Sequence, residues 1–185
     1  MITGLFFGTF DPIHMGHIQI AKNLIRHNIV KRVCFVITPI SPFKKNKKIS
    51  APHHRIHMVN LAIKDYDFFS SSDIEFNLPS PQYTARTLRY IKTRYLNQDF
   101  FIIMGADNYQ KISDWKDYKY ILDNFKICVY QRTKNKKLLP KEYVSIPGDF
   151  IDLTSSQIRE NIHSPPPDSI NKDVLKYALH HRLYS

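Results

Sequence analysis

The sequence Gly-Thr-Phe-Asp-Pro-Ile-His-Met-Gly-His, at residues 8–17, decides the fold that we expect for this chain of 185 residues. The apolar run at 2–7 is long enough for a buried strand, and apolar residues recur at helical spacing directly after the decapeptide. The decapeptide is therefore predicted to be the turn between a first strand and a helix that begins near Met15. Open α/β sheets bind ligands outside the carboxyl ends of their strands, so this turn is expected to border a ligand site.

The composition of this turn suits an anionic ligand. Gly8 permits a close approach to the backbone, and the start of the helix offers N–H groups and the positive end of a dipole. His14 and His17 are three residues apart, so they share one face of the first helical turn and can donate to the same phosphate oxygens. Gly16 leaves room for a nucleotide above the helix start. The alternatives are a metal site that adds Asp11 to the two histidines, and a pair of ordinary helix-start histidines.

Length and composition favour a single domain over residues 1–185. The hydrophobic fraction of 43% is that of a soluble globular protein, and no apolar run is long enough to span a membrane. The chain starts directly with a strand rather than a charged-then-apolar leader, and Cys34 and Cys128 lie inside apolar runs, so a cytoplasmic protein with reduced core cysteines is expected. The net charge of +11 suits nucleic acid and a substrate with several phosphates equally well.

The rest of the chain alternates apolar runs with helical patterns, which is typical of a parallel sheet with right-handed crossovers. The expected fold class is therefore α/β, a Rossmann-like, doubly wound parallel sheet with helices at the C-terminus. Further strands are predicted at 32–37, 68–76, 100–104, 125–130 and 150–153. Further helices are predicted from Pro52, over 84–91, ending at 121–122, from 154, and around 174–183.

A second helix start, at 153–159, also carries phosphate-binding side chains. Thr154 fits a capping box with the glutamine three residues on. The hydroxyls of Ser155 and Ser156 can then hold phosphate oxygens, and Arg159 lies one turn further. A bare helix start is the alternative, but the neighbouring histidine turn makes phosphate binding the favoured interpretation.

Two other strand ends carry candidate ligand-binding residues. The long basic loop at 38–50 follows the second strand, and Lys44 and Lys45 are the lysines nearest to the strand end. Gly105 follows the strand at 100–104 and permits close approach of a ligand. Asp107 can accept hydrogen bonds from ribose hydroxyls, and its alternative role is to cap a helix.

Residues 8–17 resemble the G-x-F-D-P-x-H-x-G-H signature of the HxGH nucleotidyltransferase superfamily. Later segments resemble one branch of it, the bacterial nicotinate-nucleotide adenylyltransferases. The matching segments are 39–44, 55–63, 80–88, 105–115, 153–159 and 174–184. Phe7 stands where a second glycine is common, and Leu-Thr-Ser-Ser at 153–156 replaces the usual Ile-Ser-Ser-Thr, which preserves the hydroxyls.

The resemblance implies that AMP is transferred from ATP to nicotinate mononucleotide, which gives nicotinate adenine dinucleotide (deamido-NAD) and pyrophosphate in NAD biosynthesis. It implies that His14 and His17 are catalytic, that Mg²⁺ arrives on the ATP phosphates, and that the protein supplies no metal ligands. The residues implied for ATP and its phosphates are Gly8, Thr9, Phe10, Gly16, Ser155, Ser156 and Arg159. Those implied for the acceptor nucleotide are Lys44, Tyr83, Thr84, Gly105, Asp107 and Trp115, with Tyr83, Thr84 and Trp115 around the pyridine ring.

Two alternative functions stay open at this point. Another HxGH nucleotidyltransferase, such as phosphopantetheine adenylyltransferase, would need no Tyr-Thr and Trp pocket. A basic nucleic-acid-binding protein would explain the lysines but not the two histidines, and no RNA-binding motif with regularly placed aromatics is present. We therefore expect neither nucleic acid nor a membrane as a partner. The sequence does not reveal whether the chain forms a homo-oligomer, or whether it prefers the nicotinate or the nicotinamide mononucleotide.

Overall fold

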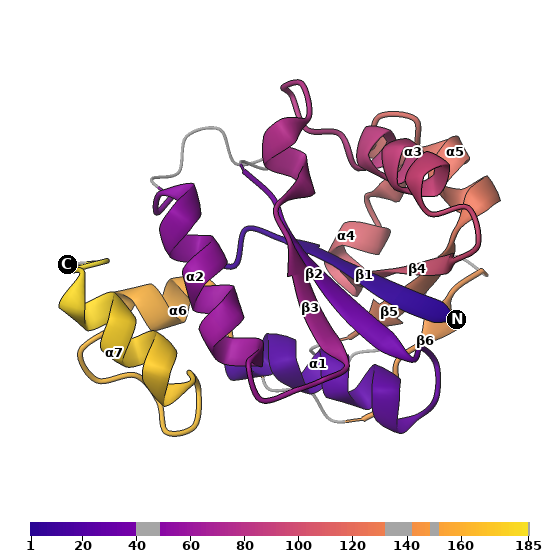
Figure 1. Ribbon diagram of the computed structural model, residues 1–185. Helices are drawn as coiled ribbons and strands as arrows, with labels where there is room; N and C mark the ends of the chain where they lie inside the picture. The colour runs from indigo at the N-terminus through magenta and orange to yellow at the C-terminus, as the bar shows by residue number, and fades with distance from the viewer. Residues whose placement is uncertain (40–48, 132–141, 149–151, 185) are drawn as a thin grey trace.

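The computed structural model describes residues 1–39, 49–131, 142–148 and 152–184. Within these ranges lies a six-stranded sheet in the order β3-β2-β1-β4-β5-β6, in which all neighbouring strands run parallel (Figure 1). The strands are β1 (Ile2–Gly8), β2 (Arg32–Ile37), β3 (Phe69–Ser72), β4 (Asp99–Gly105), β5 (Lys126–Tyr130) and β6 (Val144–Ser145). The α-helices are α1 (Met15–Arg26), α2 (Pro52–Ile63), α3 (Thr84–Arg94), α4 (Ala106–Tyr109), α5 (Tyr118–Asn124), α6 (Ser155–Glu160) and α7 (Lys172–His180). Short 3₁₀ helices lie at η2 (Ile74–Asn77) and η3 (Ile112–Asp114).

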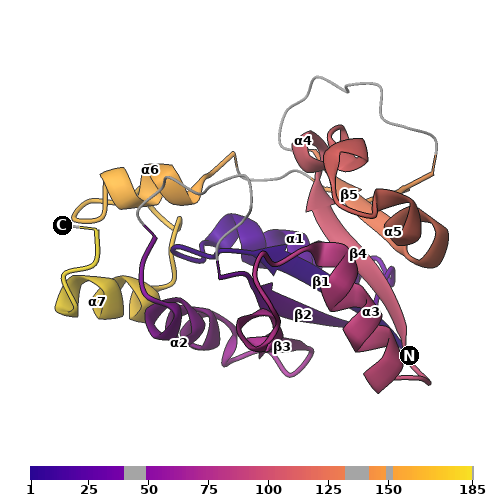
Figure 2. The same cartoon turned by 90° about the horizontal axis from the view of Figure 1, so that it is seen from above.

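Helices cover both faces of the sheet. α1, α2, α6 and α7 pack their apolar residues into one core, and α3, α4 and α5 pack theirs into another (Figure 2). The chain adds strands in one direction from β1 to β3 and in the other from β1 to β5, and the crossover helices change face at the same point, as right-handed connections require. This arrangement confirms the predicted Rossmann-like, doubly wound parallel sheet with C-terminal helices.

The central strand β1 joins the two cores. Leu5 and Phe6 are 2% and 3% exposed and belong to opposite cores, because neighbouring side chains of a strand point to opposite faces. Burial on both faces explains the unbroken apolar sequence at 2–7. The ring of Phe6 contacts those of Phe10, Phe35 and Tyr130, so an aromatic cluster supports the turn that follows β1.

The strand predicted at 68–76 is shorter in the structure. β3 ends at Ser72, and Ile74–Asn77 forms the 3₁₀ helix η2. The N–H of Ile74 donates to Oγ of Ser72 at 3.3 Å, and a local side-chain bond of this kind competes with strand pairing. The predicted strand at 68–76 was therefore too long, because β3 covers only Phe69–Ser72.

The strand predicted at 150–153 is also corrected. Residues 149–151 lie outside the described ranges, and Asp152 and Leu153 are not in a strand. The edge strand is β6 instead, where Val144 pairs with Cys128 of β5. Its two residues fall in a stretch whose polar, lysine-rich composition gives no strand signal.

The predicted positions of the cysteines agree with the structure. Cys34 lies in β2 and Cys128 in β5, and burial raises the pKa of both thiols, that of Cys128 to about 12. In the part of the chain that is described, no helix is both long enough and apolar enough to cross a membrane.

Candidate active site

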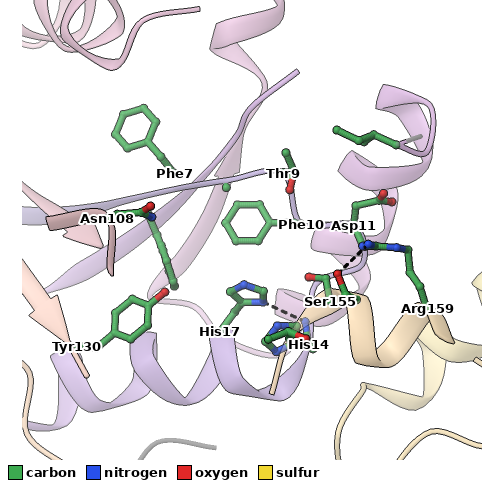
Figure 3. A pocket seen from close by; sticks show the side chains of 15 residues that line it. Phe7, Thr9, Phe10, Asp11, His14, His17, Asn108, Tyr130, Ser155 and Arg159 are labelled. Carbon is green, nitrogen blue, oxygen red and sulfur yellow. Dashed lines mark hydrogen bonds between the residues drawn. The ribbon is translucent and has the colours of Figure 1, made fainter. Parts of the chain in front are cut away.

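A cavity of about 290 Å³ lies beside the carboxyl ends of β1 and β5. The turn after β1 and the first turns of α1 and α6 form its walls (Figure 3). The lining residues are Phe6, Phe7, Gly8, Thr9, Phe10, Asp11, His14, His17, Ile49, Asn108, Tyr130, Thr154, Ser155, Ser156 and Arg159. The strand order reverses between β1 and β4, and parallel sheets bind ligands in the crevice at such a point.

Phe10 folds back over Gly8. Its φ of 47° lies in the left-handed region, and its ring covers Gly8 so closely that a Cβ there would lie 2.8 Å from Cζ of Phe10. We expected Gly8 to admit a ligand, whereas the group that packs on it here is the ring of Phe10. That ring is 2% exposed and packs edge-on against His17, with a centroid distance of 5.1 Å. The ring of Phe10 therefore supports the ring of His17.

The two histidines lie together, as their spacing predicts. Their ring centroids are 3.7 Å apart, and both side chains line the cavity (Figure 3). The backbone N–H of His14 donates to Nδ1 of His17 at 3.3 Å. Because Nδ1 accepts, a neutral His17 carries its hydrogen on Nε2, and this nitrogen can donate to a ligand.

The start of α1 offers fewer N–H groups than we expected. The N–H of Met15 donates to the carbonyl of Ser169 at 2.9 Å, and that of His17 donates to the carbonyl of His14 at 2.9 Å. The segment before α7 thus holds the first residue of α1. What α1 contributes to the cavity is mainly its two histidines and the positive end of its dipole.

The start of α6 is bound directly to the turn after β1. Oγ of Ser155 donates to the carbonyl of Pro12 at 3.0 Å. Nη1 of Arg159 donates to the carbonyl of Asp11 at 2.6 Å, and Nη2 donates to Oγ of Ser156 at 3.0 Å. The two segments that were predicted to bind phosphate therefore form one wall of the cavity.

The predicted capping box at Thr154 is present. The N–H of Gln157 donates to Oγ1 of Thr154 at 3.2 Å, and the N–H of Thr154 donates to Oε1 of Gln157 at 2.8 Å. These reciprocal bonds fix the direction in which α6 leaves the preceding chain. The hydroxyls of the next two residues are thereby held at the rim of the cavity.

Arg55 joins the chain segments behind the cavity. Its guanidinium is 1% exposed and donates to four carbonyls at 2.6 to 3.0 Å. These carbonyls belong to Thr9, Thr38, Pro39 and Ser50. Burial lowers the pKa of the guanidinium, and the nearby Asp11 carboxylate opposes that effect.

Asp11 is engaged elsewhere rather than with the histidines. Oδ1 accepts from the hydroxyl of Tyr184 at 2.6 Å, and Oδ2 accepts from the N–H of Ser50 at 3.2 Å. Among the residues that the structure describes, no group of three or more His, Cys, Asp or Glu side chains could hold a metal ion. Asp11 is therefore not placed as a third ligand beside His14 and His17.

The comparison with known proteins places the chain in a family. The sequence model described as cytidylyltransferase-like matches residues 5–165. A probable nicotinate-nucleotide adenylyltransferase from Flavobacterium psychrophilum is 36% identical over 192 residues, which cover 100% of this chain and 99% of the relative. One from Bacteroides fragilis is 35% identical over 185 residues, which cover 98% and 89%. The chain belongs to the cytidylyltransferase-like family and, within it, to the nicotinate-nucleotide adenylyltransferases.

A solved structure shows the same fold. The nicotinic acid mononucleotide adenylyltransferase of Plasmodium falciparum, complexed with NaAD, superimposes with a TM-score of 0.80 at 19% identity, over 99% of this chain and 97% of that one. At this identity the likeness concerns the architecture. The names of the full-length relatives agree with the predicted class, a nucleotidyltransferase that uses ATP.

The three residues predicted around the pyridine ring of this adenylyltransferase lie outside the cavity. Tyr83 is the N-cap of α3, Thr84 is its first residue, and Trp115 follows η3. All three are partly buried, and Trp115 packs against the core beneath α3 and α5. The elements that carry them pack on the other face of the sheet from α1, and none of the three lines the cavity.

The other predicted nucleotide-binding residues are placed as follows. Gly16 is buried in the first turn of α1 and does not line the cavity. Gly105 caps α4, and Asp107 is exposed within that helix, so the alternative role of Asp107 as a cap is wrong. Neither lines the cavity. Lys44 and Lys45 lie outside the described residues.

The sequence did not single out several lining residues. Tyr130 is the last residue of β5, and Asn108 lies in the turn of helix that follows β4. Their only sequence signal is their place after an apolar strand, which in a parallel sheet means the ligand-binding edge. Reading every strand end in this way would have found both.

We predict that Gly8→Ala destabilises the protein by about 1–3 kcal/mol, because the new methyl group overpacks against the ring of Phe10. Urea unfolding measures the loss. The same substitution should cost clearly less in a Phe10→Leu background, where the ring atoms that clash are absent. Equal losses in the two backgrounds would show that Gly8 is needed for another reason.

Proposed function

We propose that the cavity is the reaction centre in which AMP passes from ATP to nicotinate mononucleotide, giving nicotinate adenine dinucleotide and pyrophosphate. The observation that carries this proposal is the meeting of two histidines with Ser155, Ser156 and Arg159 around one cavity at the ligand-binding edge of the sheet. Imidazole, hydroxyl and guanidinium groups all donate to phosphate oxygens. The names of the full-length relatives supply the acceptor.

In this reaction an oxygen of the acceptor phosphate attacks the α-phosphorus of ATP in line. The bond from the α-phosphorus to the bridging oxygen of the β-phosphate breaks, and pyrophosphate leaves with that electron pair. No protein nucleophile is required. The protein contributes by holding the two substrates in line and by stabilising the negative charge that develops on the phosphate oxygens.

His17 is suited to stabilise that charge. Its Nδ1 accepts the N–H of His14, so a neutral His17 carries its hydrogen on Nε2, and we assign this N–H to an α- or β-phosphate oxygen. The edge-on contact with Phe10 limits rotation of the ring. His14 stacks beside it and adds a second imidazole to the same side of the cavity.

The wall formed by α6 is suited to hold the rest of the triphosphate. Ser155, Ser156 and Arg159 line the cavity next to the turn, and a guanidinium offers five N–H donors. Two of those of Arg159 already bind Asp11 and Ser156, which orients the group. We assign the β- and γ-phosphates to these side chains, with Thr9 and the backbone of Gly8 and Phe10 beside them.

The lining fits a metal-bound triphosphate better than a bare cation. Among the described residues that line the cavity, Asp11 is the single carboxylate, and both of its oxygens accept hydrogen bonds within the protein. Mg²⁺ would therefore be coordinated by the phosphate oxygens of ATP, where it would neutralise part of their charge.

The acceptor side of the proposal rests on residues outside the cavity. Tyr83, Thr84 and Trp115 would surround the pyridine ring, Gly105 and Asp107 would contact ribose, and Lys44 would attract the acceptor phosphate. Thr84 begins α3 and Gly105 ends β4, so both lie at the carboxyl edge of the sheet, as the cavity does. Gly16 stays a candidate for making space for the nucleotide.

The wider setting of the enzyme stays a prediction from the sequence. We propose a single domain over 1–185, a cytoplasmic location, and no nucleic-acid or membrane partner. A homo-oligomer is an open question, to be answered by light scattering of the purified protein.

The function is tested by incubating the purified chain with ATP, Mg²⁺ and one acceptor at a time. We expect a dinucleotide and equimolar pyrophosphate with nicotinate mononucleotide, seen by mass spectrometry. Turnover of phosphopantetheine without any dinucleotide would assign the chain to the alternative transferase. Salt-sensitive binding of duplex DNA without pyrophosphate release would favour the nucleic-acid-binding alternative. Parallel reactions with nicotinamide mononucleotide measure the preference between the two pyridines.

We predict that His17→Ala lowers kcat by on the order of 100-fold or more and weakens ATP binding only modestly, because charge stabilisation belongs mainly to the transition state. Steady-state kinetics and ATP titration measure the two effects. His27→Ala is the matched control, since this exposed histidine lies just beyond the other end of α1. Near-normal turnover by His17→Ala would remove His17 from the mechanism.

Trp115 is the only tryptophan of the chain, so the intrinsic fluorescence reports on the predicted pyridine pocket. We predict a saturable change in emission with nicotinate mononucleotide and a smaller one with ATP, because an aromatic ring stacks on the indole only in the first case. Trp115→Phe should abolish this signal and raise KM for the mononucleotide more than KM for ATP. A response to ATP alone would place the pyridine pocket elsewhere.

A further inference from the structure

The chain reaches the turn after β1 from its C-terminal end. The hydroxyl of Tyr184 donates to Oδ1 of Asp11 at 2.6 Å, across 173 residues of sequence. Tyr184 follows α7, which packs against α2, and the end of the chain lies beside these helices (Figure 1). Asp11 lies three residues before His14 in the wall of the cavity.

We propose that Tyr184 is a positioning residue for adenylyl transfer, whose hydroxyl holds the Asp11 carboxylate and, through it, the turn that carries His14. The proposal rests on the function assigned to the cavity above. Tyr184 itself does not line the cavity, so it acts through Asp11 rather than by touching a substrate.

Asp11 needs this hydrogen bond because it is 3% exposed. A buried carboxylate is tolerated only where hydrogen-bond donors or positive charges surround it. Its two donors in the described structure are the hydroxyl of Tyr184 and the N–H of Ser50. Of these two donors, only Tyr184 donates from a side chain. Without its hydroxyl, Oδ1 of Asp11 would be buried without the hydrogen bond that it now accepts.

The turn after β1 is held by two sets of hydrogen bonds, one to its backbone and one to the side chain of Asp11. From α6, Arg159 and Ser155 bind the backbone carbonyls of Asp11 and Pro12. From the C-terminal end, Tyr184 binds the side chain of Asp11. The backbone then reaches His14, whose N–H sets the hydrogen position on His17. Releasing the side chain of Asp11 would loosen the turn on which both imidazoles depend.

The direction of the bond is fixed by its surroundings. Burial, and next the charge of Asp11, raise the pKa of Tyr184, so the hydroxyl keeps its proton throughout the pH range of a typical assay. The charged groups around the pair are the guanidiniums of Arg55 and Arg159, which offset the negative charge of Asp11. Tyr184 also adopts a φ of 70°, which a non-glycine residue keeps only where its surroundings hold it.

The test is Tyr184→Phe in the full chain, which keeps the ring and removes only the hydroxyl. We expect kcat to fall on the order of 10-fold, because a small misplacement of catalytic groups slows the chemical step strongly. KM for ATP and for the mononucleotide should change less than about twofold, since uniform binding is retained. An unchanged kcat would overturn the proposal.

Tyr177→Phe is the matched control. Tyr177 lies in α7, and its hydroxyl pairs with Nδ1 of His54 at 2.8 Å, so this variant also removes one hydroxyl bond between α7 and α2. It should leave kcat unchanged, because neither residue touches the turn after β1. An equal loss in both variants, or a loss in Tyr184→Phe that only mirrors a loss of native circular dichroism, would assign Tyr184 a structural role and overturn the proposal.

A double-mutant cycle tests whether Tyr184 affects kcat through Asp11. If Tyr184 acts through Asp11, Tyr184→Phe should lower kcat much less in an Asp11→Asn background than in the native one. Independent, multiplying losses would contradict the proposal. If the unaltered protein forms no dinucleotide at all, the proposed function fails instead, so the two failures are distinguishable.

Discussion

The site depends on the hydrogen bonds that the buried guanidinium of Arg55 donates to the backbone. A parallel sheet brings several strand ends to one edge, and their last carbonyls need donors once they are covered. Arg55 donates to four carbonyls at once, which lie just after β1, just after β2 and just before α2. Leaving a buried carbonyl without a donor costs about 1–3 kcal/mol. The single side chain of Arg55 therefore does what would otherwise need several separate donors.

A buried positive charge has to be compensated, and the site does so with the same groups that shape the cavity. Asp11 opposes the effect of burial on Arg55, and its carboxylate is in turn bound by the end of the chain and by Ser50. The charge that stabilises the edge of the sheet is thus linked to the turn that carries the histidines. Fold and site share one hydrogen-bond network rather than lying side by side.

Local sequence patterns predicted much of this arrangement. The strand at 32–37, the helix after residue 14, the histidine pair and the capping box at Thr154 each depend on neighbours within a few residues, and all are present. The contact of Tyr184 with Asp11 spans 173 residues, so no local pattern could reveal it. Gly8 shows another limit of local patterns, because a glycine indicates close approach without indicating whether a ligand or the protein's own ring approaches.

The hydrogen bond from the backbone N–H of His14 to Nδ1 of His17 means that substitutions at the two histidine positions have different consequences. Because the donor is main chain, every residue except proline at position 14 supplies the same N–H. A substitution at position 14 would therefore leave the hydrogen of His17 on Nε2, whereas a substitution at position 17 would remove the acceptor itself. The second histidine of the signature should accordingly be the less replaceable one over evolutionary time, and the first could be exchanged for another phosphate-binding side chain.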